Sequence, residues 1–296
     1  MRPNLVTVRW PRPVNDGISQ LQSNLAAVRY VADDSLVTAL HLAVRLGRPL
    51  LLEGPAGVGK TALAKAMSDV LGRPLVRLQC YEGLDATHAL YDWNYPKQLL
   101  AVQDPRTSAS ESVYSEEFLL QRPLLLALRA EPTPVLLIDE VDRADEAFEA
   151  LLLEFLSEFQ VTIPELGTVR ATGRPLVILT SNRTRDLSDA LRRRCLYQWL
   201  DYPAYDQEVA ILQMYLPDVA LRLLRQVVRA VRRLRSASVL KPPGLAESID
   251  WANALAELGT ESLDEETAAL TLGCLLKTQE DVTWVTERGL ATLWNV

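Results

Sequence analysis

The chain has 296 residues, of which 48% are hydrophobic and 23% are charged, as in folded globular proteins with one large and one smaller domain. Its net charge of −7 excludes a global basic field for DNA or anionic membranes, and three scattered cysteines without a C-x-x-C pair argue against a disulfide framework or a zinc site. Residues 1–17 are rich in proline and polar groups and lack a signal-peptide core, so we expect an N-terminal arm. No apolar run is long enough to span a membrane, and cytoplasmic is the default localisation.

The first strongly patterned stretch is a strand, a glycine-rich turn and a helix. Helices are expected over residues 18–30 and from Asp33 or Asp34 to Leu46, followed by a buried strand over 50–52. The turn fits G-x-x-x-x-G-K-[ST], the pattern of a phosphate-binding loop, in which backbone N–H groups approach phosphate oxygens. Lys60 can reach the β- and γ-phosphates and the Thr61 hydroxyl can ligate Mg²⁺; a loop that only turns the chain is the alternative. The predicted nucleotide-binding residues are Gly54, Pro55, Ala56, Gly57, Val58, Gly59, Lys60, Thr61 and Ala62.

The rest of the chain alternates strands and helices and then becomes purely helical. After a strand over 75–79, the segment 81–106 contains four large aromatic residues that either pack on the core or grip a partner. Tyr91, Trp93 and Tyr95 occupy alternate positions, so their side chains would lie on one side of an extended stretch, and we expect them to be buried. Residues 107–115 are predicted to be flexible. The later predicted elements are a helix over 115–129, a strand over 135–138, a helix over 144–159, a hairpin over 160–174, strands over 176–179 and 196–200, and helices over 187–194, 206–215, 218–235, 245–258 and 265–276.

This order of elements indicates a doubly wound α/β domain over residues 18–204 and a small helical domain over 205–296. The arginines of residues 221–235 are expected to form the solvated face of a helix.

Polar residues at strand ends provide the candidate chemistry. Asp139 and Glu140 follow a buried strand at the carboxyl edge of the sheet, where ligands bind in such folds. Asp139 would hold Mg²⁺ through water, and Glu140 would act as the general base on the attacking water. Asn182 could position that water or sense the γ-phosphate, or it could be a turn residue. The arginines at 192–194 are either a solvated face or an arginine finger that completes the site of a neighbouring subunit.

The motifs GPAGVGKT, LLIDEVDRA, LTSN and DALRRRC resemble, in order and spacing, those of AAA+ ATPases. The hairpin resembles the MoxR branch, and RPLLLEGPAGVGKT, YEGLDATHALYDWNYPKQLL and DALRRRCLYQWLDYP are most similar to CoxD-type members, which are associated with maturation of the molybdenum- and copper-containing carbon monoxide dehydrogenase. The resemblance implies an AAA+ P-loop fold with a parallel five-stranded sheet in the order 5-1-4-3-2 and an all-helical lid. It also implies ATP hydrolysis with Mg²⁺ between the subunits of a ring, commonly a homo-hexamer, with Arg194 as the finger and Arg193 as the alternative.

The same resemblance implies a chaperone or remodeller that works with a von Willebrand factor A-domain protein on a metalloenzyme client. One position departs from the pattern: Glu247, in PPGLAESIDWANAL, stands where many lids carry an arginine for the γ-phosphate. Either Lys241 substitutes for that arginine or lid sensing is weak. The competing functions are a DNA-acting AAA+ motor, against which the acidic net charge counts, and a nucleotide-gated scaffold, against which the intact Asp139–Glu140 pair counts.

Overall fold

The computed structural model describes residues 14–103, 114–237 and 239–289. They form two compact units, Met1–Gly54 with Lys60–Trp199 and Pro55–Gly59 with Leu200–Val296, each with its own hydrophobic core. Residues 1–13 of the predicted arm and 107–113 of the predicted flexible stretch lie outside the described residues. The remainder of the predicted arm is helical, because helix α1 (Val14–Ala27) begins earlier than residue 18.

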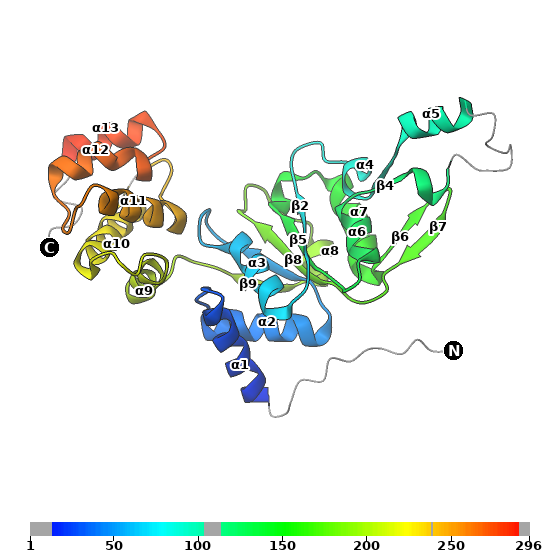
Figure 1. The fold of residues 1–296 in the computed structure, drawn as a ribbon, viewed down its shortest axis with the longest axis horizontal. Helices are drawn as coiled ribbons and strands as arrows, with labels where there is room; N and C mark the ends of the chain where they lie inside the picture. Colours follow the sequence, from blue (N-terminus) through cyan, green and yellow to red (C-terminus); the bar gives the residue numbers. More distant parts are fainter. Residues whose placement is uncertain (1–13, 104–113, 238, 290–296) are drawn as a thin grey trace. The chain divides into compact units, whose positions relative to one another are not determined.

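The first unit is built on a parallel sheet of five strands in the order β2-β5-β8-β1-β9 (Figure 1). Numbered along the chain and read from β9, this is the predicted order 5-1-4-3-2, which is confirmed. The three inner strands are buried along their whole length because they have neighbours on both edges, whereas the edge strands β2 and β9 are partly exposed. The strands are β1 (Leu50–Glu53), β2 (Leu75–Gln79), β5 (Val135–Asp139), β8 (Leu176–Ser181) and β9 (Leu196–Trp199).

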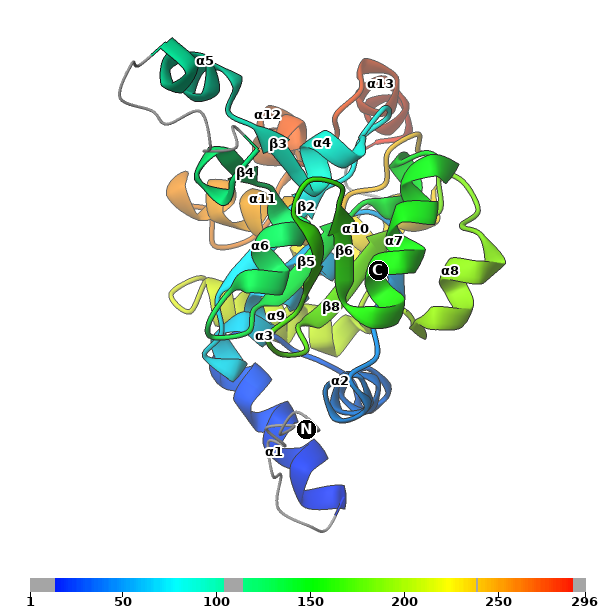
Figure 2. The same cartoon turned by 90° about the vertical axis from the view of Figure 1, so that its right-hand side faces the viewer.

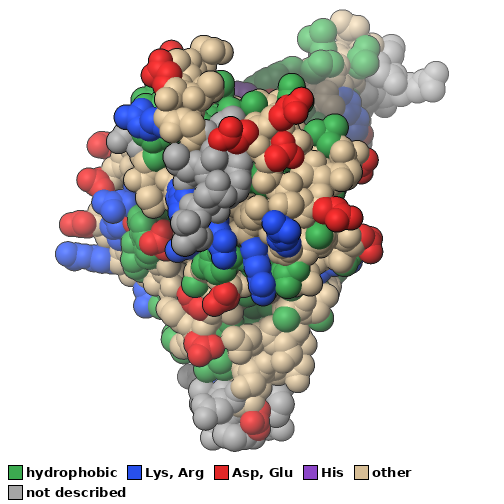
Figure 3. Space-filling model, turned by 90° about the vertical axis from the view of Figure 1, so that its left-hand side faces the viewer, with side chains coloured by type: hydrophobic (Ala, Val, Ile, Leu, Met, Phe, Trp, Pro, Cys, Tyr) green, Lys and Arg blue, Asp and Glu red, His purple; other side chains and the backbone are tan. Residues whose placement is uncertain are grey.

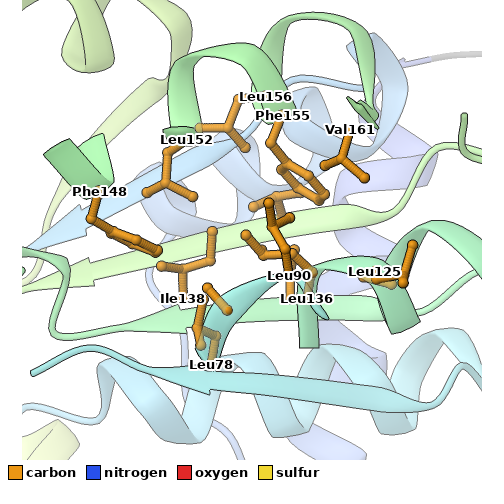
Figure 4. Close-up of a cluster of buried hydrophobic side chains, with 14 of the residues drawn as sticks. Leu78, Leu90, Leu125, Leu136, Ile138, Phe148, Leu152, Phe155, Leu156 and Val161 are labelled. Carbon is orange, nitrogen blue, oxygen red and sulfur yellow. The ribbon is translucent and has the colours of Figure 1, made fainter. Parts of the chain in front are cut away.

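Helices cover both faces of this sheet. Right-handed crossovers place α3 (Lys60–Leu71) on one face and α6 (Pro123–Arg129) and α7 (Glu146–Glu158) on the other. Figure 4 shows side chains of α7, among them Phe148 and Leu152, gathered with Leu136 and Ile138 of β5 in the main core. Burying each such side chain stabilises the fold by roughly 1.5–3 kcal/mol, so this core fixes β5 and the residues at its carboxyl end. Helices α1, α2 (Asp34–Leu46) and α8 (Asp189–Arg194) also belong to this unit.

The segment between β2 and β5 differs from the prediction. The predicted helix over 115–129 is confirmed only from Pro123, where α6 begins; before it come a 3₁₀ turn η1 (Glu116–Phe118) and a strand β4 (Leu119–Gln121). Strand β4 pairs with β3 (Tyr91–Trp93), a non-local contact, and proline at the first helical position sets where α6 begins because it needs no N–H partner there. Two short helices lie in the same segment, α4 (Ala86–Ala89) and α5 (Tyr95–Gln103).

The alternating aromatic residues are only partly buried. Trp93 is 7% exposed, as expected, and Tyr91 is half-buried. Tyr95 contradicts the prediction because α5 starts at this residue and ends the extended stretch, which leaves its side chain 61% exposed. Figures 1 and 2 both show α5 standing away from the sheet. The predicted hairpin is confirmed as β6 (Gln160–Ile163) and β7 (Gly167–Arg170).

The second unit is helical and packs around the fully buried Trp251. Its helices are α9 (Tyr205–Tyr215), α10 (Leu221–Ser236), α11 (Leu245–Glu257), α12 (Glu265–Leu275) and α13 (Gln279–Arg288), the last of which was not predicted. The expectation of a solvated arginine face on α10 is wrong for Arg235, whose guanidinium forms a buried ion pair with Glu208.

Residues 55–59, the middle of the glycine-rich loop, belong to this second unit by their contacts. The Leu245 N–H donates to the Gly57 carbonyl at 2.9 Å, and the Tyr202 hydroxyl donates to the Ala56 carbonyl at 3.2 Å. Gly57 has φ 75°, and a Cβ there would lie 2.7 Å from the Cα of Gly244. Only glycine therefore suits position 57.

Candidate active site

The loop after β1 ends at Lys60, the first residue of α3. Its side chain is buried, and Nζ donates to the carbonyl of Gly54 at 2.8 Å. Burial lowers the pKa of Lys60, and the negative charges of Asp142, Asp139 and Glu140 partly offset that shift. The ammonium group thus lies beside the N–H groups that begin α3, and together these positive groups suit a phosphate.

A hydroxyl and a carboxylate meet next to this loop. The Thr61 hydroxyl donates to Asp139, with its Oγ1 3.0 Å from Oδ1 and 3.2 Å from Oδ2. Thr180 of β8 donates to the same carboxylate at 2.5 Å and accepts the Glu140 N–H at 2.9 Å. Asp139 is 3% exposed, so these bonds fix its orientation. The structure brings the two predicted Mg²⁺ ligands together.

Two side chains of the edge strand β2 also hold the acidic pair. Arg77 donates to Oδ2 of Asp139 through Nη2 at 2.6 Å and Nε at 3.1 Å. Gln79 donates to Oε2 of Glu140 at 3.1 Å. Sequence reasoning missed both residues. Their spacing in LVRLQC puts them on one face of a strand, but only the pairing of β2 with β5 brings that face to the acids.

Glu140 begins the short 3₁₀ turn η2 (Val141–Arg143) with a left-handed backbone, φ 54° and ψ 49°. Its Oε2 accepts the bond from Gln79 and another from Nη1 of Arg143 at 3.1 Å. Beside it lies a hollow of about 440 Å³, lined by Glu82, Glu140, Arg143, Asn182 and Thr184. The predicted base and the predicted water-positioning residue thus line the same hollow.

The arginines before β9 do not line this hollow. Arg192 forms an ion pair with the buried Glu53, its two terminal nitrogens lying 3.1 and 3.3 Å from the carboxylate oxygens. Arg194 donates to the Ser157 hydroxyl at 2.8 Å and to the Ala190 carbonyl at 3.0 Å. Arg193 is exposed, and its carbonyl accepts from Arg48. Neither predicted finger residue is brought to Glu140 within one chain.

Glu247 and Lys241 of the helical unit have local partners. Glu247 caps α11 by accepting the N–H of Gly244 at 3.0 Å. Lys241 is exposed, and its N–H donates to the buried carboxylate of Asp281 at 3.2 Å. The position at which many lids carry an arginine is therefore used here to begin a helix.

The residues present fit a nucleotide with Mg²⁺. Thr61 and Asp139 provide the hard oxygen ligands that Mg²⁺ prefers, already within hydrogen-bond distance of each other. Gly54 and Gly59 have φ of 157° and 96°, conformations that glycine adopts without strain, and the absence of a Cβ leaves the loop's N–H groups accessible. Within the described ranges, His, Cys, Asp and Glu form no group of three or more suited to a metal, and no helix is long and apolar enough to cross a membrane.

Comparison with known proteins agrees with this geometry. Residues 49–195 match the family described as "AAA domain (dynein-related subfamily)". This stretch runs from the strand before the loop to the end of α8 and so contains all the site residues of the α/β unit described above. The α/β unit therefore has the AAA+ P-loop fold, and residues 49–195 are similar in sequence to an AAA domain.

The chain is also similar to individual proteins. It is 28% identical over 205 residues to the gas vesicle ATPase GvpN of Haloferax mediterranei, a match that covers 64% of this chain and 57% of that protein. It is 29% identical over 168 residues to the chaperone protein ClpB of Rhodopirellula baltica, covering 52% and 17%. A solved structure of a mutant RuvB of Thermotoga maritima shares the fold, with a TM-score of 0.50 at 18% identity over 87% of this chain and 70% of that one. The chain thus spans little more than half the length of the gas vesicle relative.

Proposed function

We propose that this protein binds ATP with Mg²⁺ and hydrolyses it. The observation that supports the proposal most strongly is the meeting of Lys60, Thr61, Asp139 and Glu140 at the carboxyl edge of one sheet. Residues of these types at this edge bind phosphate, hold a divalent cation and activate water. A glycine loop that only turned the chain would need neither a buried lysine nor a carboxylate bonded to the next threonine.

Each residue has a defined role in this proposal. The loop N–H groups from Gly54 onward and the ammonium of Lys60 bind the phosphates, and Thr61 and Asp139 hold Mg²⁺. Bound ATP supplies the phosphoryl group that is transferred to water, and Mg²⁺ neutralises charge on its phosphates. Glu140 accepts the proton of the attacking water at Oε1, which accepts no hydrogen bond from any described residue. Asn182, across the hollow, orients that water.

We further propose that hydrolysis drives remodelling of another protein by a ring of subunits, with Arg194, or Arg193, reaching the site of the neighbour. Two features support this: the chaperone and ATPase relatives, and the arginines of α8, which do not line the hollow of their own chain. The resemblance of the motifs supports a von Willebrand factor A-domain partner and a metalloenzyme client such as a molybdenum-containing carbon monoxide dehydrogenase.

A role on nucleic acid finds less support. The net charge is −7, and the face in Figure 3 carries acidic and basic side chains interspersed with apolar ones. Nucleic-acid binding relies on clustered basic side chains that neutralise several phosphates.

The decisive test is Glu140→Gln, with Glu146→Gln as the matched control, since Glu146 is exposed on α7. Removing a general base lowers turnover by about 10²-fold or more, while the phosphate loop still binds ATP. We expect that loss in steady-state phosphate release, with the affinity for a fluorescent ATP analogue within about twofold of wild type. Wild-type turnover in Glu140→Gln, or an equal loss in Glu146→Gln, would refute the assignment.

A further inference from the structure

Asp142 lies two residues after Glu140, in the 3₁₀ turn η2, and is 2% exposed. A buried carboxylate is costly unless its oxygens accept hydrogen bonds. Its Oδ2 accepts three: from the Thr184 N–H and the Thr184 hydroxyl, both at 2.8 Å, and from the Asn182 N–H at 3.2 Å. Its Oδ1 is buried and accepts none from the part of the chain that the structure describes.

These three donors belong to the turn that follows β8. Arg183, between the two bonded residues, has a left-handed backbone, φ 57°, and its N–H donates to the Ser181 hydroxyl at 3.0 Å. A non-glycine residue adopts this conformation only where surrounding bonds hold it. Without the carboxylate of Asp142, the N–H groups on both sides of Arg183 would lose their partner, and the turn would be free to relax.

Two residues of this turn line the hollow. Asn182 and Thr184 line it together with Glu140. Asp142 and Glu140 belong to one short, hydrogen-bonded turn, in which the Arg143 N–H donates to the Glu140 carbonyl. One short segment therefore carries the base at its first residue and, through Asp142, holds the backbone of Asn182, which lines the same hollow.

We propose that Asp142 is a positioning residue for hydrolysis, which holds Asn182 at the distance from Glu140 that the attacking water requires. This proposal rests on the proposed function. Asp142 itself lines no part of the hollow and acts through Asn182. Misplacing a water-orienting group by a fraction of an ångström lowers the rate of the chemical step and leaves nucleotide binding unchanged.

A second buried carboxylate provides the control. Glu149 of α7 accepts the Ser188 N–H at 2.9 Å and pairs with Arg185 at 2.5 Å, at the far end of the same loop. It supports the loop as Asp142 does, but through Arg185 and Ser188 and not through Asn182 or Thr184. If Asp142 mattered only for stability, Asp142→Asn and Glu149→Gln would lower the thermal midpoint and the activity in parallel.

The test is a double-mutant cycle of Asp142→Asn with Asn182→Ala, followed by kcat and by the affinity for a fluorescent ADP analogue. We expect Asp142→Asn to lower kcat about tenfold or more in the wild-type background, with ADP affinity within about twofold, because the bonds that hold the turn lose their charged acceptor. In the Asn182→Ala background the same change is expected to cost less than about twofold, since its target is gone. Glu149→Gln is expected to leave kcat within about threefold.

Additive losses in the cycle would overturn the proposal, as would wild-type kcat in Asp142→Asn or in Asn182→Ala. If Asp142→Asn does not fold, Thr184→Val against Thr184→Ser makes the same comparison, because valine lacks the hydroxyl that donates to Asp142 and serine keeps it. Equal kcat in these two would then overturn the proposal. A wild-type protein without turnover would refute the proposed function itself, which is a different outcome.

Discussion

The buried ion pair of the helical unit allows a quantitative prediction. Glu208 of α9 is fully buried, and the side chain of Arg235 on α10 is 7% exposed. Their two hydrogen bonds measure 2.8 and 2.9 Å, Arg235 Nε donates to the Pro243 carbonyl at 2.7 Å, and its guanidinium lies 4.0 Å from the centre of the Tyr202 ring. Every charge in this cluster has a partner. Removing Arg235 therefore leaves Glu208 buried and poorly compensated, with only Arg232 at 4.0 Å and the Ser248 hydroxyl at 3.4 Å as partners among the described residues.

Arg235→Met keeps the length of the side chain but removes its charge. Breaking a buried pair in this way costs about 3–5 kcal/mol, a large part of the roughly 5–15 kcal/mol that stabilises a domain. For a unit of roughly 100 residues, each kcal/mol lowers the thermal midpoint by about 4–8 °C, so the midpoint is expected to fall by roughly 12 °C or more. Urea unfolding followed by circular dichroism gives the free energy, and a thermal scan gives the midpoint.

Two further variants make the result interpretable. Arg229→Met removes an exposed arginine from the same helix and is expected to change stability by about 0.5 kcal/mol at most. Arg235→Met combined with Glu208→Leu removes both charges and is expected to recover most of the loss, because apolar replacement of a buried pair is often neutral. If Arg235→Met were no more harmful than Arg229→Met, or the double variant no better than the single, the argument from an uncompensated charge would be wrong.

Two other predictions concern the proposed hydrolysis. Arg194→Ala is expected to assemble normally but to lose about 10³-fold in turnover. Mixing it with Glu140→Gln should restore activity at interfaces that combine an intact base with an intact arginine. No recovery after confirmed subunit exchange would mean that Arg194 acts within its own chain. Arg77→Gln removes a cation 2.6 Å from Asp139, so the Mg²⁺ concentration that half-saturates binding of a fluorescent ADP analogue is expected to fall by about threefold or more. An unchanged Mg²⁺ midpoint would leave Arg77 with only a structural role in β2.

Local patterns in the sequence were sufficient to predict the inner strands of the sheet and the residues of the candidate site at their ends. The phosphate-loop motif is contiguous, and each inner strand is an apolar run that ends in polar residues, so the strands and the meeting of Thr61 with Asp139 could be predicted. The conformation of the loop and the burial of parallel strands depend mainly on residues that are close in sequence, so both can be recognised from a short sequence segment.

Residues that depend on distant partners were missed. Leu119–Gln121 was predicted as helix because its pairing with β3 spans about 30 positions, which no local period reveals. Arg77 and Asp142 were overlooked because a charged residue in a strand or a turn is normally solvated. Arg235 did leave a signal: it lies four residues after Val231 and seven after Val228, on the apolar stripe of α10, where an arginine requires a buried acid.

Four buried carboxylates among the described residues of the α/β unit link the candidate site to the arginines of α8. Asp139 and Asp142 are bonded to threonines of β8 and of the turn that carries Asn182, and Glu149 is bonded at the far end of the same loop, just before α8. Glu53, immediately before Gly54, completes the set by binding Arg192 of α8 through two nitrogens. The helix that carries Arg193 and Arg194 is thus tied to the strand that begins the phosphate loop, and also to the loop that carries Asn182. Because a buried carboxylate keeps its partners or incurs a large cost, α8 cannot shift without disturbing the edge that holds the phosphate loop and Asn182. Arg192 therefore has its role within its own chain, and an arginine that serves a neighbour must be sought at 193 or 194, where the side chains are exposed.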